Sequence, residues 1–186
     1  MSTILHRQSV WTAEDIARMP DGERYELIGG ELEPMAPAGE WHGTASGNLH
    51  ALVGSYVLSN NLGRIFTAET GFHLATAPDT VLAPDFAFVA KDRCTVAVSE
   101  KFSTTVPDLV LETRSPSDSA AQVRRKVKLW LSLGVRVVWD LDPRRGVLTA
   151  HYSDGSSEQF LRDDVLTCAP LFPGLSVPIR SILLEM

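Results

Sequence analysis

The stretch Pro-Asp-Leu-Val-Leu-Glu-Thr-Arg-Ser-Pro-Ser, residues 107–117, joins an apolar run to charged groups. Leu109, Val110 and Leu111 are typical of a buried strand, yet the chain runs directly from them into Glu112 and Arg114. Because alternate side chains of a strand share one face, Glu112 and Arg114 are expected on the same side. A core strand that ends in a carboxylate and a guanidinium is not an ordinary strand end, and we expect it to carry a function.

The rest of the chain divides into helices and strands around this strand. Thr12 and Asp15 form a capping box that predicts a short helix, and Gly29-Gly30 predicts a tight hairpin. Ser117 is the predicted N-cap of a later helix that ends at Gly134. The predicted order is a hairpin (24–28 and 31–35), a helix (41–60), three strands (64–74, 80–90 and 106–113), a helix (117–133), a strand (135–141), a hairpin (146–152 and 158–161) and an irregular tail.

This order predicts the fold class. Strands followed by a helix and then by another buried strand favour an α/β (α+β) fold, with a mixed β-sheet flanked by helices and an N-terminal hairpin. The chain has 186 residues without an internal repeat or linker, so we expect one domain over residues 1–186.

Composition restricts the classes of function. The chain has no apolar run of about 18 residues, so we expect no membrane span. Its N-terminus lacks the apolar core of a signal peptide, which predicts a cytoplasmic protein. The net charge of −6 disfavours a large nucleic-acid surface, but residues 114–145 hold eight basic and three acidic residues. That segment is either one basic face or the solvated flank of a helix.

Two acids lie inside apolar runs of neighbouring predicted strands. Asp85 precedes Phe86, and Glu112 ends the strand described above. Such carboxylates repel each other unless a cation lies between them, and Mg²⁺ is the natural candidate. Asp108 competes for this role, but it lies four residues from Glu112, about 13 Å along a strand. We therefore expect Asp85 and Glu112 to share the metal, and Asp108 to mark the solvated start of its strand.

A lysine on the following helix is the third element. Lys126 lies in phase with Gln122, Leu129 and Leu133, so its stem can run along apolar surface and bring the ammonium to the sheet edge. The alternative is that Lys126 is one of several cations on a solvated helix face.

Taken in order, these motifs resemble the PD-(D/E)XK nuclease superfamily, and within it the Uma-type branch of small restriction-endonuclease-like proteins. The resemblance covers about residues 12–180. It rests on Tyr25-Glu-Leu-Ile-Gly-Gly-Glu-Leu32, His42, Pro84-Asp-Phe-Ala-Phe-Val89, residues 107–117, Lys126 with Trp130, Gly134-Val135 and Trp139-Asp-Leu-Asp-Pro143.

The resemblance implies a site. Asp85 and Glu112 would be metal ligands for Mg²⁺ or Mn²⁺, and both would be catalytic. The superfamily pattern places lysine two residues after the glutamate, where this chain has Arg114. In the Uma-type branch a helix lysine takes that role, which corresponds to Lys126. Glu31 and His42 also fall on motif positions, with a surface acid and a capping histidine as the alternatives.

The function implied is phosphodiester hydrolysis, with DNA as the expected substrate. Arg114 would support the scissile phosphate, and flanking phosphates would contact Arg124, Arg125 and Lys128. By analogy, a homodimer is expected where both strands are cut. One alternative is a catalytically inactive module of the same fold that binds nucleic acid or a protein partner. Another is a buried ion cluster without any ligand.

Overall fold

The computed structural model describes residues 10–20, 24–95 and 99–183, and the ends of the predicted domain lie outside these ranges. The helices are α1 (Ala13–Ala17), α2 (Glu40–Ser59) and α3 (Ala120–Ser132), with 3₁₀ turns at Lys91–Arg93 and Ile179–Ile182. The strands are β1 (Tyr25–Ile28), β2 (Glu31–Pro34), β3 (Gly63–Thr67), β4 (Phe72–Ala75), β5 (Thr80–Leu82), β6 (Phe86–Ala90), β7 (Leu109–Thr113), β8 (Val137–Asp142), β9 (Val147–Tyr152), β10 (Ser157–Leu161), β11 (Val165–Cys168) and β12 (Phe172–Pro178).

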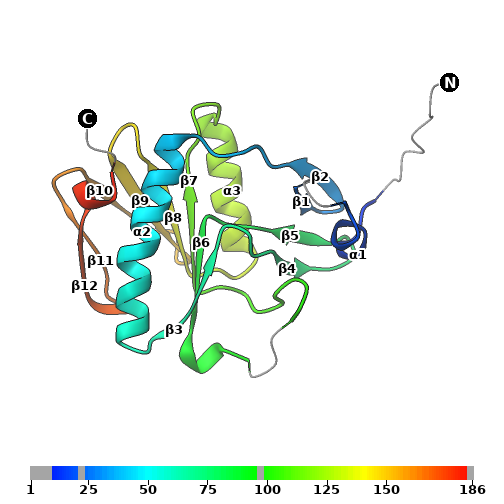
Figure 1. The fold of residues 1–186 in the computed structure, drawn as a ribbon, viewed down its shortest axis with the longest axis horizontal. Helices are drawn as coiled ribbons and strands as arrows, with labels where there is room; N and C mark the ends of the chain where they lie inside the picture. Colours follow the sequence, from blue (N-terminus) through cyan, green and yellow to red (C-terminus); the bar gives the residue numbers. More distant parts are fainter. Residues whose placement is uncertain (1–9, 21–23, 96–98, 184–186) are drawn as a thin grey trace.

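The main sheet has six strands in the order β10-β9-β8-β7-β6-β3. Strand β7 pairs antiparallel with β6 and parallel with β8, and α3 makes the crossover between β7 and β8 (Figure 1). Leu109 and Leu111 belong to the core cluster that contains buried residues of α2, whereas Val110 belongs to the cluster that contains buried residues of α3. The sheet is therefore mixed and has a helix on each face, which confirms the predicted fold class.

A smaller sheet stands beside the main one and carries the N-terminal hairpin. Its order is β2-β1-β5-β4, and β1 and β2 meet at the Gly29-Gly30 turn. Both glycines have positive φ, +57° and +82°, a backbone conformation that glycine adopts without a steric cost. The predicted hairpin is confirmed. Figure 1 shows this sheet on the side of α3 that faces away from α2.

Two of the predicted strands were wrong in extent. Residues 64–74 form β3 and β4, and residues 80–90 form β5 and β6, so each predicted strand is divided between the two sheets. A turn closed by the hydrogen bond from Thr70 N to Thr67 O makes the first break. Pro84, which has no N–H to donate to a ladder, lies in the second. Alternation of apolar residues continues through both breaks, so the pattern could not place them.

Two further predictions needed correction. The N-cap of α3 is Ser119 and not Ser117, because Gln122 lies three residues after Ser119 and completes a capping box with it. The tail is not irregular, since β11 and β12 form a two-stranded sheet. Its apolar residues, among them Phe172, join the core cluster on the α2 face of the main sheet.

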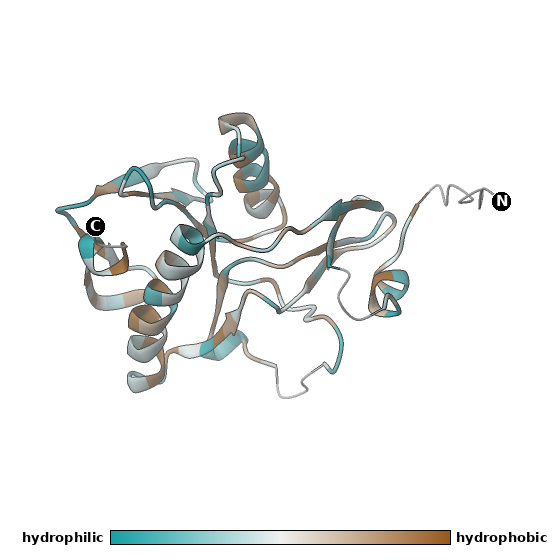
Figure 2. Ribbon diagram, turned by 45° about the horizontal axis from the view of Figure 1, so that its top comes forward, coloured by the Kyte–Doolittle hydropathy of each residue, from teal (hydrophilic) through white to brown (hydrophobic). Residues whose placement is uncertain are grey.

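Helix α3 carries both hydrophobic and hydrophilic residues, brown and teal in Figure 2, as expected of a helix with one buried face. Its buried residues are Val127 and Trp130.

In the described parts of the chain, no helix combines the length and apolar character that a membrane crossing requires.

Candidate functional site

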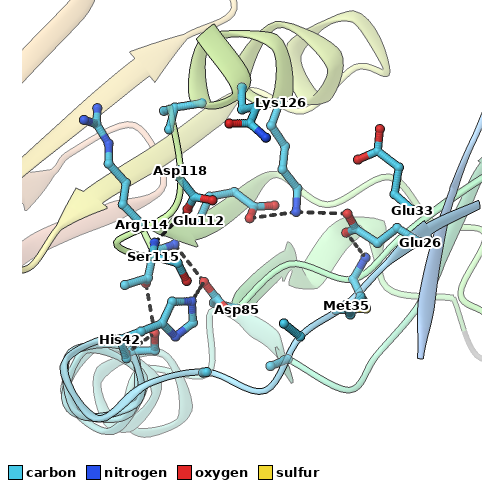
Figure 3. A pocket seen from close by; sticks show the side chains of 18 of the residues that line it. Glu26, Glu33, Met35, His42, Asp85, Glu112, Arg114, Ser115, Asp118 and Lys126 are labelled. Atoms are coloured by element: carbon cyan, nitrogen blue, oxygen red, sulfur yellow. Dashed lines mark hydrogen bonds and ion pairs between the residues drawn. The ribbon is translucent and has the colours of Figure 1, made fainter. Parts of the chain in front are cut away.

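A pocket of about 780 Å³ opens where the two sheets, α2 and α3 come together. Its floor includes the start of β6 and the end of β7, and its walls come from the hairpin, the first half of α2, and α3. Figure 3 shows Lys126 pointing down from α3 and His42 pointing in from α2, with Asp85 and Glu112 between them. Six of the nine predicted site residues line the pocket: His42, Asp85, Glu112, Arg114, Arg125 and Lys126.

Lys126 lies between two carboxylates from different sheets. Its Nζ is 3.1 Å from Glu112 Oε2 on β7 and 3.0 Å from Glu26 Oε2 on β1. Burial of the ammonium opposes its charge, but the attraction of Glu112 and Glu26 outweighs this, and the pKa of Lys126 is raised. Lys126 is therefore a fixed ammonium in the protein.

Glu112 is the most strongly perturbed acid of the pocket. Its Oε1 accepts a hydrogen bond of 2.6 Å from the indole Nε1 of buried Trp130, which fixes the carboxylate against α3. Desolvation raises the pKa of Glu112, Lys126 opposes this, and the neighbouring carboxylates of Glu26 and Asp85 raise it further, so the net shift is upward. The positive charge around Glu112 is too small to offset its burial and the neighbouring acids. A bound cation would supply the missing positive charge.

Asp85 lies at the start of β6, across from the end of β7. Its Oδ2 accepts a hydrogen bond of 2.7 Å from the backbone N–H of Thr113 and lies 3.1 Å from His42 Nε2. The hydrogen bond to Asp85 raises the pKa of His42 and outweighs the effect of burial. Ser46 Oγ, one turn along α2, lies 2.9 Å from Thr113 Oγ1, so α2 is attached to the same strand end.

Arg114 occupies the position where the superfamily pattern has lysine, but its guanidinium is already bonded. Its Nε donates to Asp140 Oδ1 at 2.7 Å, a second nitrogen bonds Asp140 Oδ2, and Asp142 Oδ2 lies at 3.6 Å. Figure 3 shows the guanidinium directed away from Lys126 and Asp85. Arg114 lines the pocket, and its charge joins the ends of β7 and β8.

The other predicted residues lie at the rim or outside the pocket. Arg125 lines the rim, where it pairs with Glu33 at 2.7 Å. Glu31 is exposed beside the hairpin turn and does not line the pocket. Arg124 and Lys128 are exposed on α3, and neither lines the pocket.

Glu26 was not among the predicted site residues, and the structure places it in the centre of the site. Glu26 is buried, and its second oxygen accepts a hydrogen bond of 2.9 Å from Ala83 N. A two-residue turn at Gly29-Gly30 sets Glu26 opposite Glu33 in the hairpin. Two acids in facing positions repel each other unless cations lie nearby. The hairpin register could therefore have predicted that cations lie beside Glu26 and Glu33. Lys126 and Arg125 of α3 supply them.

The predicted position of Asp108 in the solvated start of β7 was wrong. Its side chain is 0% exposed, and it contacts Arg93 at 2.7 Å and Arg136 at 3.4 Å. It does not line the pocket. The two arginines compensate the charge, which is why the carboxylate can be buried.

The donor set of the pocket fits a hard divalent cation that keeps part of its water shell. Glu26, Asp85 and Glu112 bring three carboxylates against the single ammonium of Lys126 and a histidine. Among the described residues, no three His, Cys, Asp or Glu side chains form a complete chelating group. Mg²⁺ is commonly held by one or two carboxylates with waters in its other positions, and Asp85 and Glu112 match that requirement.

Comparison with known proteins gives two findings. The family model Uma2, described as "Putative restriction endonuclease", matches residues 13–180. Among solved structures, the chain is similar to "a putative nuclease belonging to DUF820 from Anabaena variabilis ATCC 29413". That match has a TM-score of 0.75 at 17% identity and covers 92% of this chain and 96% of the other, so it establishes the fold alone. No curated protein matches the chain.

Proposed function

Because the chain belongs to the Uma2 family, we propose that it is a metal-dependent endonuclease that hydrolyses phosphodiester bonds in DNA. The observation that carries this proposal is the position of Lys126 between Glu112 and Glu26, beside Asp85, at the floor of an open pocket. A phosphodiester needs positive charge near its nonbridging oxygens as charge develops in the transition state. The pocket has the ammonium of Lys126 and, in Asp85 and Glu112, two carboxylates suited to a cation.

Each residue has a role in this proposal. Asp85 and Glu112 would hold Mg²⁺ or Mn²⁺, which supplies Lewis-acid activation of a bound water and of the phosphate. Lys126 stays protonated, so it stabilises charge on the phosphate and does not act as the base. Glu26 positions Lys126 from the side opposite Glu112. His42 holds the carboxylate of Asp85 in its orientation.

Phosphates on either side of the reacting bond would contact cations of α3. Arg125 lies at the rim, and Arg124 and Lys128 are exposed on the same helix. The rim pair between Arg125 and Glu33 is largely exposed, with side-chain exposures of 67% and 42%, so a phosphate can displace the carboxylate at small cost. Arg114 takes no part in this contact, because Asp140 holds its guanidinium.

The test is Mg²⁺-dependent cleavage of labelled DNA by the wild type and by two variants, Asp85→Ala and Glu112→Ala. Loss of a metal ligand should lower the rate by about a hundredfold or more, since one group of this kind contributes several kcal/mol to the transition state. Glu31→Ala is the matched control, because it removes an exposed carboxylate outside the pocket and should cleave at the wild-type rate. Equal cleavage by all four proteins would contradict the proposal.

A second candidate is an inactive nuclease-fold module that binds nucleic acid or a protein partner. One observation favours it: Arg114, in the motif-lysine position, is bonded to Asp140 through two of its nitrogens. This candidate predicts DNA binding that weakens with salt, without cleavage in Mg²⁺ or Mn²⁺.

The endonuclease proposal includes a homodimer where a duplex is cut on both strands. Light scattering of the purified chain measures whether a dimer forms.

A further inference from the structure

The acids at the centre of the pocket and His42 are withdrawn from the molecular surface, whereas Lys126 is 32% exposed. The side chains of Asp85, Glu112 and His42 are 16%, 17% and 14% exposed, and that of Glu26 is 7% exposed. In a regular duplex each strand is held in a stiff helix by pairing and stacking, so bringing one phosphate to a recessed group costs deformation of the helix. A strand that is not paired avoids this cost.

The size of the pocket fits one nucleotide and its neighbours. At about 780 Å³ it lies in the range of sites that enclose a small molecule, and it is bounded by the hairpin, α2 and α3. A duplex would have to lie across the mouth of such a pocket. A flexible single strand can enter it.

The hairpin and α3 sides of the pocket carry apolar side chains beside their charged ones. Ile28 and Met35 lie on the side of the hairpin, and Val123 and Leu129 lie on α3. All four are partly exposed. Apolar side chains beside a phosphate site suit the face of a base, because every base has an apolar face that stacking or packing can cover.

The wall formed by α2 lacks side chains at two positions. Gly43 and Gly47 line the pocket, and a Cβ built on either of them has no heavy atom within 4 Å. Glycine inside a helix costs stability relative to alanine, and here no neighbouring atom of the protein requires it. The space that a side chain at Gly43 or Gly47 would occupy is therefore open to the pocket.

The charges of the pocket leave few cations for a row of phosphates. Seven acidic side chains line it against four basic ones, Arg24, Arg114, Arg125 and Lys126. Each of these four already contacts a carboxylate. Inside the pocket, this lining favours one or two phosphates together with a base, and Arg124 and Lys128 outside it remain for flanking phosphates.

We propose that the pocket accepts an unpaired nucleotide and that the substrate is single-stranded DNA. The phosphate lies at the floor, and the base lies between the apolar side chains of the hairpin and α3 and the bare face of α2. This inference rests on the proposed function for the cleavage step, but the binding preference can be measured without cleavage. A single site suffices for one strand, so this substrate does not require a dimer.

The first experiment compares three fluorescent DNA probes of one sequence with the full chain: a single strand, a perfect duplex, and a duplex with one extrahelical nucleotide. Fluorescence anisotropy is recorded in Ca²⁺, a hard cation with oxygen ligands, and a denaturing gel checks that the probes remain intact. The single strand and the extrahelical probe should bind about tenfold more tightly than the perfect duplex. Equal or tighter binding of the perfect duplex would overturn the inference.

The second experiment narrows the pocket at α2. Gly47→Ala should raise the Tm by about 2–4 °C, because alanine favours the helix and meets no atom of the protein. The same change should weaken binding of the single strand about fivefold, and Gly47→Leu should weaken it more, because each intrudes into the pocket. Ser55→Ala, at an exposed α2 position that does not line the pocket, is the control and should bind as the wild type does.

The outcomes separate this inference from the proposed function. If single strands bind preferentially and Gly47→Ala weakens them, but Mg²⁺ supports no cleavage of any probe, the substrate class holds and the nuclease proposal fails. If cleavage occurs and the perfect duplex is cut as fast as the single strand, the nuclease proposal holds and this inference fails. A stabilised Gly47→Ala variant with unchanged binding also contradicts the inference.

Discussion

The chain contains two Pro-Asp pairs, Pro84-Asp85 and Pro107-Asp108, in almost equivalent positions at opposite ends of one pair of strands. Each aspartate comes directly before a strand, β6 or β7, and each carboxylate accepts a hydrogen bond from the last N–H of the other strand. Asp85 Oδ2 accepts from Thr113 N at 2.7 Å, and Asp108 Oδ2 accepts from Ala90 N at 2.8 Å. The two ends of this antiparallel pair are therefore built alike.

The surroundings make the two ends different. Asp108 is fully buried, and two arginines compensate its charge. Asp85 opens onto the pocket, where its partner is a histidine and where Glu112 and Glu26 add further negative charge. The same dipeptide thus forms a charge-compensated ion cluster at one end and, at the other, an acid-rich cluster that we propose holds a cation. The local motif is the same at both ends, so the proposal that Asp85 is a metal ligand rests on the balance of charges around it.

The largest expected effect is the loss of stability on changing the structural aspartate. Asp108→Asn keeps the shape of the side chain but removes the charge that Arg93 and Arg136 surround. We expect the free energy of unfolding in urea to fall by about 3 kcal/mol. Asp85→Asn is the matched change at the other end and should alter stability by less than about 1 kcal/mol, because it also relieves repulsion among the pocket acids. Equal losses of unfolding free energy for the two variants would show that Asp85 is as structural as Asp108.

A smaller effect of opposite sign is expected at Glu112. An acid whose pKa is raised in the folded state binds its proton more readily there, so ionisation above the unfolded pKa of about 4.3 destabilises the fold. Glu112→Gln keeps an acceptor for Trp130 Nε1 and removes the buried charge. Urea unfolding at pH 7 in EDTA should show a variant as stable as the wild type or more stable by about 1 kcal/mol. A loss of several kcal/mol would instead mark Glu112 as a structural acid like Asp108.

The smallest effect is the pH dependence of the pair between His42 and Asp85. Because the pKa of His42 is raised in the folded state, its contribution to stability is fully present below the unfolded pKa of about 6.5 and is lost as the pH rises through the folded value. The difference in unfolding free energy between the wild type and His42→Asn, measured in EDTA, should therefore shrink by about 0.5–1 kcal/mol from pH 6 to pH 9. A difference independent of pH would show that the pair carries no charge.

Much of this arrangement could be predicted from the sequence, because it depends on local patterns. Alternation in β7 placed Glu112 at a strand end, and helical phase placed Lys126 on the face of α3 toward the sheet. The Gly29-Gly30 turn fixed the hairpin. These are properties of a strand, a helix and a turn taken singly.

The remainder depends on contacts between distant segments. The pairing of β1 with β5, which brings Ala83 N to Glu26, joins residues far apart in the chain and has no local pattern. The burial of Asp108 needs Arg93 and Arg136 from two other segments. The engagement of Arg114 by Asp140 follows from the parallel register of β7 and β8. For these groups, the sequence shows which residues are charged, and only the folded chain shows which partners they contact.

Calorimetric titration with Mn²⁺ tests most directly the claim that the Asp85 end of the strand pair is a cation site and the Asp108 end is structural. The wild type should bind the metal with a Kd below millimolar. The Kd of Asp85→Asn and that of Glu112→Gln should each be higher by about tenfold or more. Asp108→Asn, measured at a temperature where it is folded, should bind as the wild type does. Absence of binding to the wild type at millimolar Mn²⁺, or equal binding by the wild type, Asp85→Asn and Glu112→Gln, would contradict the account.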